Sequence, residues 1–293
     1  MRADGLHRIA VLTADDYAAI DQLATDCNAL DGGQLRLNRE LLLMRPTDST
    51  RDWLWYADGT LLGCLLVFAF GPDEAELVGM VQSAHRRRGI FTQLYEAAHA
   101  DCAARGFGQL LLMVERDQEA GHGFITHIGA TFAHAEYAME LVTPPPTTLR
   151  HADLTLRAAT PADAPAMTPI LAAAFAEDEE DPADFARSME RNPHRRWLVA
   201  LAGTTPIATM GLVGDTTETA IYGFAVQPAW QGRGFGRQIL AQTVTRLLAE
   251  GTQHIILEVA TENARALGLY LASGFRQVTA YEYYAVSLAG SPK

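Results

Sequence analysis

The sequence predicts an α/β (α+β) fold arranged as two tandem domains, and three observations support this prediction. The chain has 293 residues, which suits two domains of ordinary size. Hydrophobic residues make up 48% of the chain and charged residues 20%, values typical of globular proteins. Strand patterns alternate with helix patterns in each half, which indicates mixed sheets packed against helices.

An internal repeat divides the chain. Four features recur 145 residues later, namely Val81-Gln82 at Val226-Gln227, Gly89 at Gly234, Val114 at Val259 and Gly129 at Gly274. A constant separation of this kind is typical of a duplicated unit. The proline-rich stretch Thr143-Pro-Pro-Pro-Thr-Thr148 lies between the copies and predicts an extended linker. We therefore expect a first domain over residues 1–142, a linker over 143–150 and a second domain over 151–293.

The two copies show the same order of elements. In the second copy the pattern predicts a strand over 219–226, a helix from about 236 to 250, a strand over 253–259, a helix over 263–272 and a strand near 281–286. In the first copy it predicts a strand over 75–81, a helix over about 90–105 and a strand over 109–114. Each copy thus predicts the same α/β unit.

Composition excludes several classes of function. The formal charge of −12 disfavours a nucleic-acid partner and an anionic membrane surface. Lys293 is the only lysine, so Schiff-base, Walker A and protein-kinase chemistry lack their interior lysine. The three cysteines, Cys27, Cys64 and Cys102, form neither a disulfide framework nor a zinc pattern, which fits a reducing cytoplasm.

A glycine-rich turn, Gln231-Gly-Arg-Gly-Phe-Gly236, joins a predicted strand to a predicted helix. Glycines there allow a ligand to approach the backbone, and the free amides at the helix N-terminus favour a phosphate group. The turn alone also fits a tight strand-to-helix connection. A dinucleotide fold is disfavoured, because the third glycine is misplaced for that motif.

A longer pattern surrounds this turn. It comprises a strand, (Gln/Arg)-x-x-Gly-x-(Gly/Ala), a helix, a Leu-x-Val strand and then Asn263-x-x-Ala266-x-x-x-Tyr270-x-x-x-Gly274-Phe275. This pattern resembles the GCN5-related N-acetyltransferase (GNAT) superfamily, over about 154–286 and most specifically over 222–275. The first half resembles it through Arg86-Arg-Arg-Gly89 and Ile128-Gly-Ala-Thr-Phe132. The tandem organisation is similar to that of two-domain members such as mycothiol synthase, which implies two GNAT-like domains, each a mixed, mostly antiparallel sheet flanked by helices.

The resemblance implies acetyl-CoA as co-substrate and no metal. Backbone groups of Phe224, Ala225 and Val226 would pair with the amide groups of pantetheine, and Asn263 would lie beside the thioester. Backbone amides of the turn would hold the pyrophosphate, and the residues concerned are Gln231, Gly232, Arg233, Gly234, Phe235, Gly236 and Arg237.

Acetyl transfer to an amine needs a base for the ammonium proton and an acid for the departing thiolate. Tyr270 matches the position of the acid in the superfamily. Glu258, within Leu257-Glu258-Val259, resembles the base of ribosomal-protein alanine N-acetyltransferases. The structural alternatives are an aromatic side chain that packs at a helix end for Tyr270, and a solvent-facing strand residue for Glu258.

The first copy lacks these groups. At the separation of 145 residues, Met113, Ile125 and Gln118 stand in the places of the glutamate, tyrosine and asparagine, and Phe91 stands in the place of Gly236. Neither methionine nor isoleucine can transfer a proton. We expect a degenerate copy with at most a second, weaker CoA site, formed by Val81, Arg86, Arg87, Arg88 and Gly89.

The expected reaction is direct transfer of acetyl to a primary amine of a small molecule, catalysed in the second domain. The acidic run at 177–181 would attract a cationic amine or form a solvated face. Trp197, Trp230 and Tyr222 would line an acceptor pocket or fill the core. His122 and His127 lack a third ligand nearby, so no metal site is expected.

Two alternatives remain open, a non-catalytic acyl-CoA-binding or sensing module and an acetyltransferase acting on protein or peptide N-termini. We expect a monomer with an internal pseudo-dimer, or a homodimer.

Overall fold

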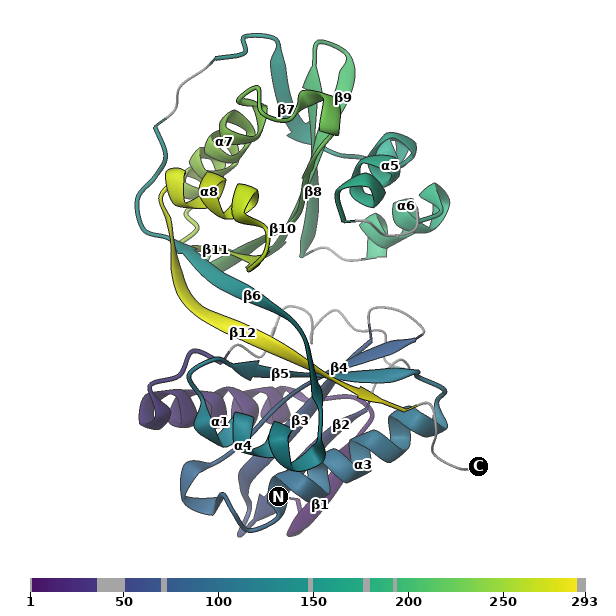
Figure 1. Cartoon of the computed structure of the whole chain (residues 1–293), viewed down its shortest axis with the longest axis vertical. Helices are drawn as coiled ribbons and strands as arrows, with labels where there is room; N and C mark the ends of the chain where they lie inside the picture. Colours follow the sequence, from purple (N-terminus) through teal and green to yellow (C-terminus); the bar gives the residue numbers. More distant parts are fainter. Residues whose placement is uncertain are drawn as a thin grey trace. The chain divides into compact units, whose positions relative to one another are not determined.

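The computed structural model describes residues 2–35, 51–69, 73–146, 150–175, 180–191 and 194–288. The chain forms two compact units (Figure 1). Unit 1 comprises Met1–Glu136 and Thr279–Lys293, and unit 2 comprises Tyr137–Val278. Strands β6 (Thr131–Leu141) and β12 (Phe275–Ser287) contribute residues to both units.

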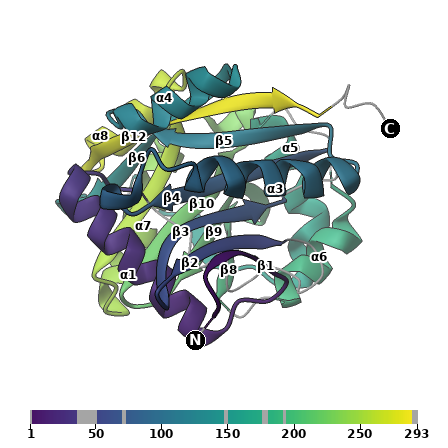
Figure 2. The same ribbon diagram turned by 90° about the horizontal axis from the view of Figure 1, so that it is seen from below.

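Unit 1 is a mixed sheet with one parallel strand pair. Its other strands are β1 (Gly5–Ile9), β2 (Asp52–Ala57), β3 (Thr60–Phe68), β4 (Glu74–Val81) and β5 (Gln109–Glu115), in the order β1-β2-β3-β4-β5-β12. Its helices are α1 (Ala14–Asp31), α3 (Ile90–Ala104) and α4 (Glu119–Ile128). Only the β4–β5 pair is parallel among the pairs recorded in this unit. Figure 2 shows α3 lying over the sheet, and its buried residues belong to the main core of the unit.

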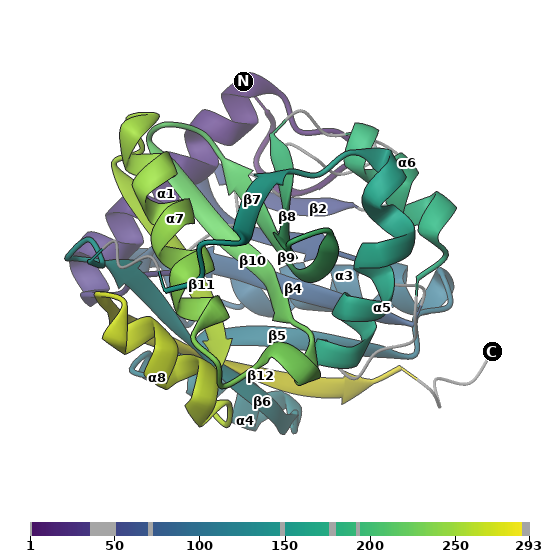
Figure 3. The same cartoon turned by 90° about the horizontal axis from the view of Figure 1, so that it is seen from above.

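Unit 2 repeats this architecture. Its strands are β7 (Leu154–Ala158), β8 (Arg195–Ala202), β9 (Thr205–Gly214), β10 (Glu218–Val226) and β11 (His254–Ala260), in the order β6-β11-β10-β9-β8-β7. Its helices are α5 (Ala164–Phe175), α6 (Pro182–Arg191), α7 (Phe235–Ala249) and α8 (Ala264–Ala272). Figure 3 shows α5 and α6 on one side of β8–β10 and α7 on the other. Separate apolar clusters fill the two faces.

The predicted fold class is confirmed, and the predicted elements agree closely with the observed ones. Helices α3, α7 and α8 and strands β4, β5, β10 and β11 begin and end within about two residues of the sequence-based bounds. The last strand is longer than predicted, since β12 begins at Phe275. Its end pairs with β5 in antiparallel register from Tyr281↔Glu115 to Ser287↔Gln109, which explains why residues after 278 group with unit 1. The division into 1–142 and 151–293 stays a prediction.

Candidate active site

A gap opens where two parallel strands of unit 2 separate. Strands β10 and β11 pair from Glu218↔His254 to Ile221↔Leu257. Beyond that point β10 continues to Val226 and β11 to Ala260, with no further pairing between these fully described strands. The end of β10 therefore carries backbone groups that an extended ligand can meet as another strand would.

A β-bulge sits at the start of this gap. The β9–β10 register is regular up to Tyr222↔Gly211 and resumes at Ala225↔Thr209, so that two residues, Gly223 and Phe224, face one residue of β9. Gly223 has φ +53°, a left-handed conformation that side chains disfavour. Bulges of this kind redirect the strand, and here the redirected residues are those at the gap.

The glycine-rich turn leads from β10 into α7. Gly232 has φ +74° and Gly234, the N-cap of α7, has φ +94°, and both values explain why glycine stands there. The side chain of Gln231 donates from Nε2 to the carbonyl oxygen of Val226 at 2.7 Å and ties the turn to the strand end. The first amides of the 15-residue helix α7 face the gap without helical partners and favour an anion.

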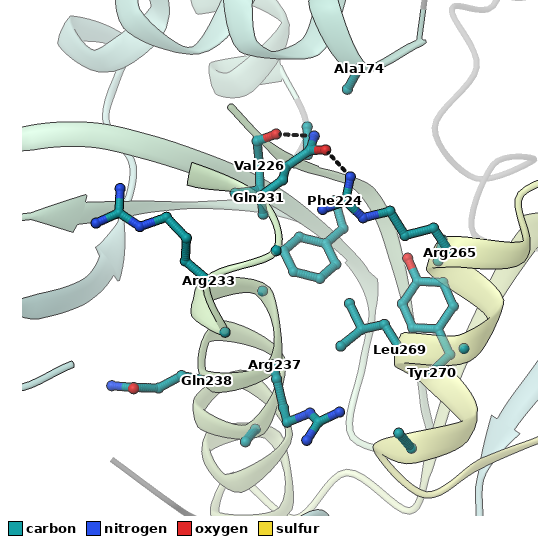
Figure 4. Close-up of a pocket in the computed structure, with 18 of the residues that line it drawn as sticks. Ala174, Phe224, Val226, Gln231, Arg233, Arg237, Gln238, Arg265, Leu269 and Tyr270 are labelled. Carbon is teal, nitrogen blue, oxygen red and sulfur yellow. Dashed lines mark hydrogen bonds between the residues drawn. The ribbon is translucent and has the colours of Figure 1, made fainter. Parts of the chain in front are cut away.

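These elements enclose a cavity of about 870 Å³ in unit 2 (Figure 4). Eleven of the residues predicted to bind cofactor or act in catalysis line it: Phe224, Ala225, Val226, Gln231, Gly232, Arg233, Gly234, Gly236, Arg237, Asn263 and Tyr270. All charged side chains among the described lining residues are arginines, at positions 150, 233, 237 and 265. In a chain of charge −12, this lining suits a polyanionic ligand.

Tyr270 lies on α8 with 7% of its surface exposed, and its side chain reaches the cavity opposite Phe224 (Figure 4). Its ring packs near Phe275 at 6.1 Å, and its hydroxyl has no hydrogen-bond partner among the described residues. Burial raises the pKa of Tyr270 to about 12. The hydroxyl therefore stays protonated at neutral pH, the form that a proton donor requires.

Two predicted residues lie outside the lining. Glu258 is exposed on β11, between Leu257 and Val259, which are buried in the core beneath α7 and α8. Strand alternation turns the glutamate to the opposite face of the sheet. The side chain of Phe235 is buried, with its ring stacked 3.7 Å from that of His151. Only the backbone of Phe235 is thus placed to serve a ligand in the turn.

Other predicted residues combine binding positions with structural contacts. Asn263 is the N-cap of α8, where its Oδ1 accepts from the amide of Ala266 at 3.0 Å. Trp197 is buried in the core beneath α5 and α6, and Trp230 packs against the other core. Neither tryptophan belongs to the cavity lining, which favours the core interpretation for both.

The acidic run falls partly outside the described residues, which omit 176–179. Asp181 is described, and its Oδ1 accepts from the amide of Ala183 at 2.7 Å near the start of α6.

Sequence reasoning missed several residues of the cavity. Arg265 donates from Nη1 to Gln231 Oε1 at 2.6 Å and so bridges α8 and the turn (Figure 4). Gln238, only 4% exposed, accepts at Oε1 from the amides of Arg150 and His151, both at 2.9 Å. A glutamine in a helix does not by itself predict burial, so the sequence gives no sign of the role of Gln238. For Arg265, its position two residues after Asn263 is the one sequence feature that points to the cavity.

The corresponding cavity of unit 1 is smaller, at about 550 Å³. Val81, Arg86, Arg87 and Gly89 line it, whereas Arg88 is exposed and donates to the carbonyl oxygen of Ala84 at 3.2 Å. The guanidinium of Arg86 is already engaged, since its Nη1 donates to Asp31 Oδ1 at 3.0 Å.

Aromatic rings narrow this second cavity. The rings of Phe91 and Phe124 lie 4.7 Å apart, edge to face. The equivalent pair in unit 2 is Gly236 and Leu269, and a Cβ added to the glycine would lie 3.6 Å from Cδ2 of the leucine. Two aromatic rings therefore line the unit 1 cavity between the turn helix and the next helix, where unit 2 has a glycine and a leucine.

The chain matches the model of the acetyltransferase (GNAT) family over residues 4–130 and 164–275. It belongs to the GNAT family. N-alpha-acetyltransferase RimI of Mycobacterium tuberculosis is 36% identical over 140 residues, covering 46% of this chain and 86% of RimI. Mycothiol acetyltransferase of Beutenbergia cavernae is 31% identical over 226 residues, covering 71% of this chain and 75% of that protein.

A tandem GNAT protein from the clavulanic acid biosynthesis pathway shares the fold, with a TM-score of 0.74, 17% identity, and coverage of 98% of this chain and 100% of that one. The family and its relatives establish that this GNAT protein is an enzyme, an acetyl-CoA-dependent acyltransferase with tandem organisation. None of the helices in the described ranges is long and apolar enough to cross a bilayer.

Proposed function

We propose that the cavity of unit 2 binds acetyl-CoA and catalyses direct transfer of its acetyl group to the primary amine of a small molecule in the cytoplasm. The observation that carries this proposal is the largely buried side chain of Tyr270, whose hydroxyl has no hydrogen-bond partner among the described residues and which lines a cavity with four arginines. In the unit 1 cavity Ile125 stands in the place of Tyr270, and the paired rings of Phe91 and Phe124 line the wall.

The backbone of unit 2 would hold the cofactor along two sides. The end of β10, from Phe224 to Val226, offers unpaired groups to the amides of pantetheine. The amides of the turn and the N-terminus of α7 would hold the pyrophosphate, assisted by Arg233 and Arg237. This placement brings the thioester between the strand end and Tyr270.

The chemistry follows from the groups at that point. The amine nitrogen attacks the thioester carbonyl carbon, forms the new C–N bond and expels the CoA thiolate as the C–S bond breaks. One ammonium proton first passes to Glu258 through water on the other face of the sheet. Tyr270 then gives its proton to the thiolate, and the second proton lost by the amine nitrogen returns to the tyrosinate. No covalent enzyme intermediate is required.

A second candidate acceptor is the N-terminus of a peptide. The relative named N-alpha-acetyltransferase RimI favours it, as does the Leu257-Glu258-Val259 sequence. We place the small-molecule amine first, because a relative named for mycothiol aligns over 71% of this chain, whereas RimI aligns over 46%.

The test measures thiol release from acetyl-CoA by the full chain across a panel of amino sugars, polyamines and short peptides with free N-termini. Turnover with a small amine and none with peptides is the expected result. Turnover with peptides alone would show that the acceptor is a peptide N-terminus and not a small-molecule amine. Saturable acetyl-CoA binding without thiol release from any acceptor would contradict the enzymatic proposal for this cavity and favour a binding module.

A further inference from the structure

Unit 2 contains one strand residue that unit 1 lacks. In unit 1 the β3–β4 register runs without interruption from Gly63↔Val81 to Phe68↔Glu76. In unit 2 the corresponding β9–β10 register shifts by one residue between Tyr222 and Ala225. Corresponding residues of β4 and β10 are 144 apart before the shift and 145 apart after it, so the bulge of Gly223 and Phe224 stands where unit 1 has the single residue Gly79.

Trp197 packs directly against this glycine. A Cβ placed on Gly223 would lie 2.8 Å from Cη2 and 3.0 Å from Cζ3 of the indole, closer than real Cβ contacts. The tryptophan is 8% exposed, and its ring lies between those of Phe185 on α6, at 5.1 Å, and Tyr222 on β10, at 5.0 Å. Gly211 on β9 leaves room for the ring of Tyr222. The bulge therefore packs against a cluster of aromatic rings in edge-to-face contact.

The first unit lacks both parts of this arrangement. The strand pair Trp53↔Leu65 of unit 1 corresponds to the pair Leu198↔Met210 of unit 2. The residue before it, Asp52, therefore stands in the place of Trp197. Asp52 is 3% exposed, and its Oδ1 accepts from the amide of Val67 at 3.2 Å. The strand bulge and the tryptophan thus occur together in unit 2 and are both missing from unit 1.

We propose that Trp197 is a positioning residue for acetyl transfer, which holds the Gly223 bulge and thereby the backbone of Phe224–Val226 that receives the cofactor. The inference rests on the proposed function, because it assigns that backbone to acetyl-CoA. A smaller ring at position 197 no longer reaches the glycine, so the strand end shifts relative to the turn and to Tyr270. Sub-ångström placement of such groups is what turnover depends on.

The first experiment compares Trp197→Phe with Trp53→Phe, a change to a tryptophan in unit 1 that is also 8% exposed. Calorimetry gives the Kd for acetyl-CoA, steady-state kinetics give kcat and KM, and thermal unfolding gives Tm. Trp197→Phe is expected to raise the Kd about tenfold and to lower kcat, whereas Trp53→Phe lowers Tm and leaves the Kd within twofold. An unchanged Kd and kcat for Trp197→Phe would overturn the inference.

A double-mutant cycle tests the contact itself. Gly223→Ala alone is expected to weaken acetyl-CoA binding strongly, because the added methyl overlaps the indole. In the Trp197→Phe background that overlap is relieved, so the double variant binds better than the product of the two single losses predicts. Purely multiplicative losses would overturn the inference, since a tryptophan that only stabilises the core has no reason to couple with Gly223.

The two proposals fail in different ways. A wild-type chain that binds acetyl-CoA but acetylates no amine contradicts the proposed function, while the effect of Trp197 on the Kd is still measurable and decides the inference. A wild-type chain that turns over, with Kd and kcat unaffected at Trp197, contradicts the inference alone.

Discussion

The turns of the two units share a backbone but differ in what surrounds them. Gln231 in unit 2 and Arg86 in unit 1 each donate to the carbonyl oxygen that ends the preceding strand, at 2.7 and 2.9 Å. Gly232 and Arg87 both have positive φ, +74° and +63°. The difference lies beside the turn, where unit 2 has Gly236 and Leu269 and unit 1 has the rings of Phe91 and Phe124.

The glycine-rich turn alone is therefore not sufficient evidence of an active site. A strand-to-helix turn persists in unit 1, where Ile125 replaces the tyrosine and the β3–β4 register has no bulge. What distinguishes unit 2 is the strand bulge at Gly223 and Phe224 together with Gly236 and Tyr270, which line one cavity with Phe224. Substitutions that exchange residues between the units therefore test which of these differences matter for binding and catalysis.

The largest effect is expected at Tyr270. Replacing it with phenylalanine removes the proposed proton donor and is expected to lower kcat about 100-fold, with the Kd for acetyl-CoA changed less than about threefold. Steady-state kinetics and calorimetry measure the two quantities. Tyr95→Phe in unit 1 is the control, because burial raises the pKa of that tyrosine as well and no activity is expected to depend on it. Equal turnover of Tyr270→Phe and wild type would remove Tyr270 from the mechanism.

The pH profile tests the same residue in the wild type. Because burial raises the pKa of Tyr270 to about 12, the hydroxyl remains protonated through the neutral and mildly alkaline range. We therefore expect kcat of the wild type and of Tyr270→Phe to depend on pH in the same way up to about pH 11. A decline between pH 8 and 10 confined to the wild type would contradict the assigned protonation state.

A smaller loss is expected at Glu258. Glu258→Gln is expected to lower kcat/KM about tenfold at pH 7, because the glutamate acts through water and bulk water partly replaces it. The loss shrinks at higher pH, where more of the amine is already unprotonated. Glu262→Gln, also exposed, is the control. If the two variants have the same kcat/KM, the glutamate on β11 is only a solvent-facing strand residue.

The capping boxes of the two units predict a pH-dependent stability. Thr160 and Asp163 in unit 2 match Thr13 and Asp16 in unit 1. Hydrogen bonding from Arg157 holds the pKa of Asp163 well below its usual range. The carboxylate therefore stabilises the fold above its unfolded pKa near 4, and this contribution is lost as the pH falls further.

Asp163→Ala is expected to lower the free energy of unfolding by about 1 kcal/mol at pH 7. The difference from wild type should diminish below about pH 3, as acid protonates the wild-type carboxyl. Denaturant unfolding at several pH values measures it. A difference that stays constant down to pH 2 would contradict the assignment.

The smallest effect concerns the backbone of the turns. Arg87 has φ +63° where unit 2 has glycine, a conformation that strains a side-chain-bearing residue. Arg87→Gly is expected to stabilise the chain by about 0.5 kcal/mol, and Gly232→Ala to destabilise it by about 1 kcal/mol. Thermal unfolding of both variants measures these changes. Shifts of Tm in the same direction for the two variants would contradict the prediction.

Much of the site could be predicted from the sequence, because its parts are local. Glycine spacing predicts the turn, and apolar periodicity predicts α7 and α8. Most of the residues that the sequence predicts to bind the cofactor line one cavity. The role of each residue toward acetyl-CoA stays a prediction.

Other features depend on pairing between distant segments, which local patterns do not encode. The bulge at Gly223 appears only when β10 is set against β9. The pairing of Phe91 with Phe124 requires α3 and α4 to meet. The pairing of β12 with β5 joins residues more than 160 positions apart.

The central claim is that the chain has one working cofactor site, in unit 2. Calorimetric titration with acetyl-CoA tests it most directly, on the wild type and on Gly236→Phe, which copies the unit 1 residue into unit 2. We expect one acetyl-CoA site per chain in the wild type. In the variant we expect at least a 100-fold loss of affinity, because the added ring would occupy cavity space beside Leu269 and Phe224. Two equivalent sites, or unchanged binding by Gly236→Phe, would contradict the claim.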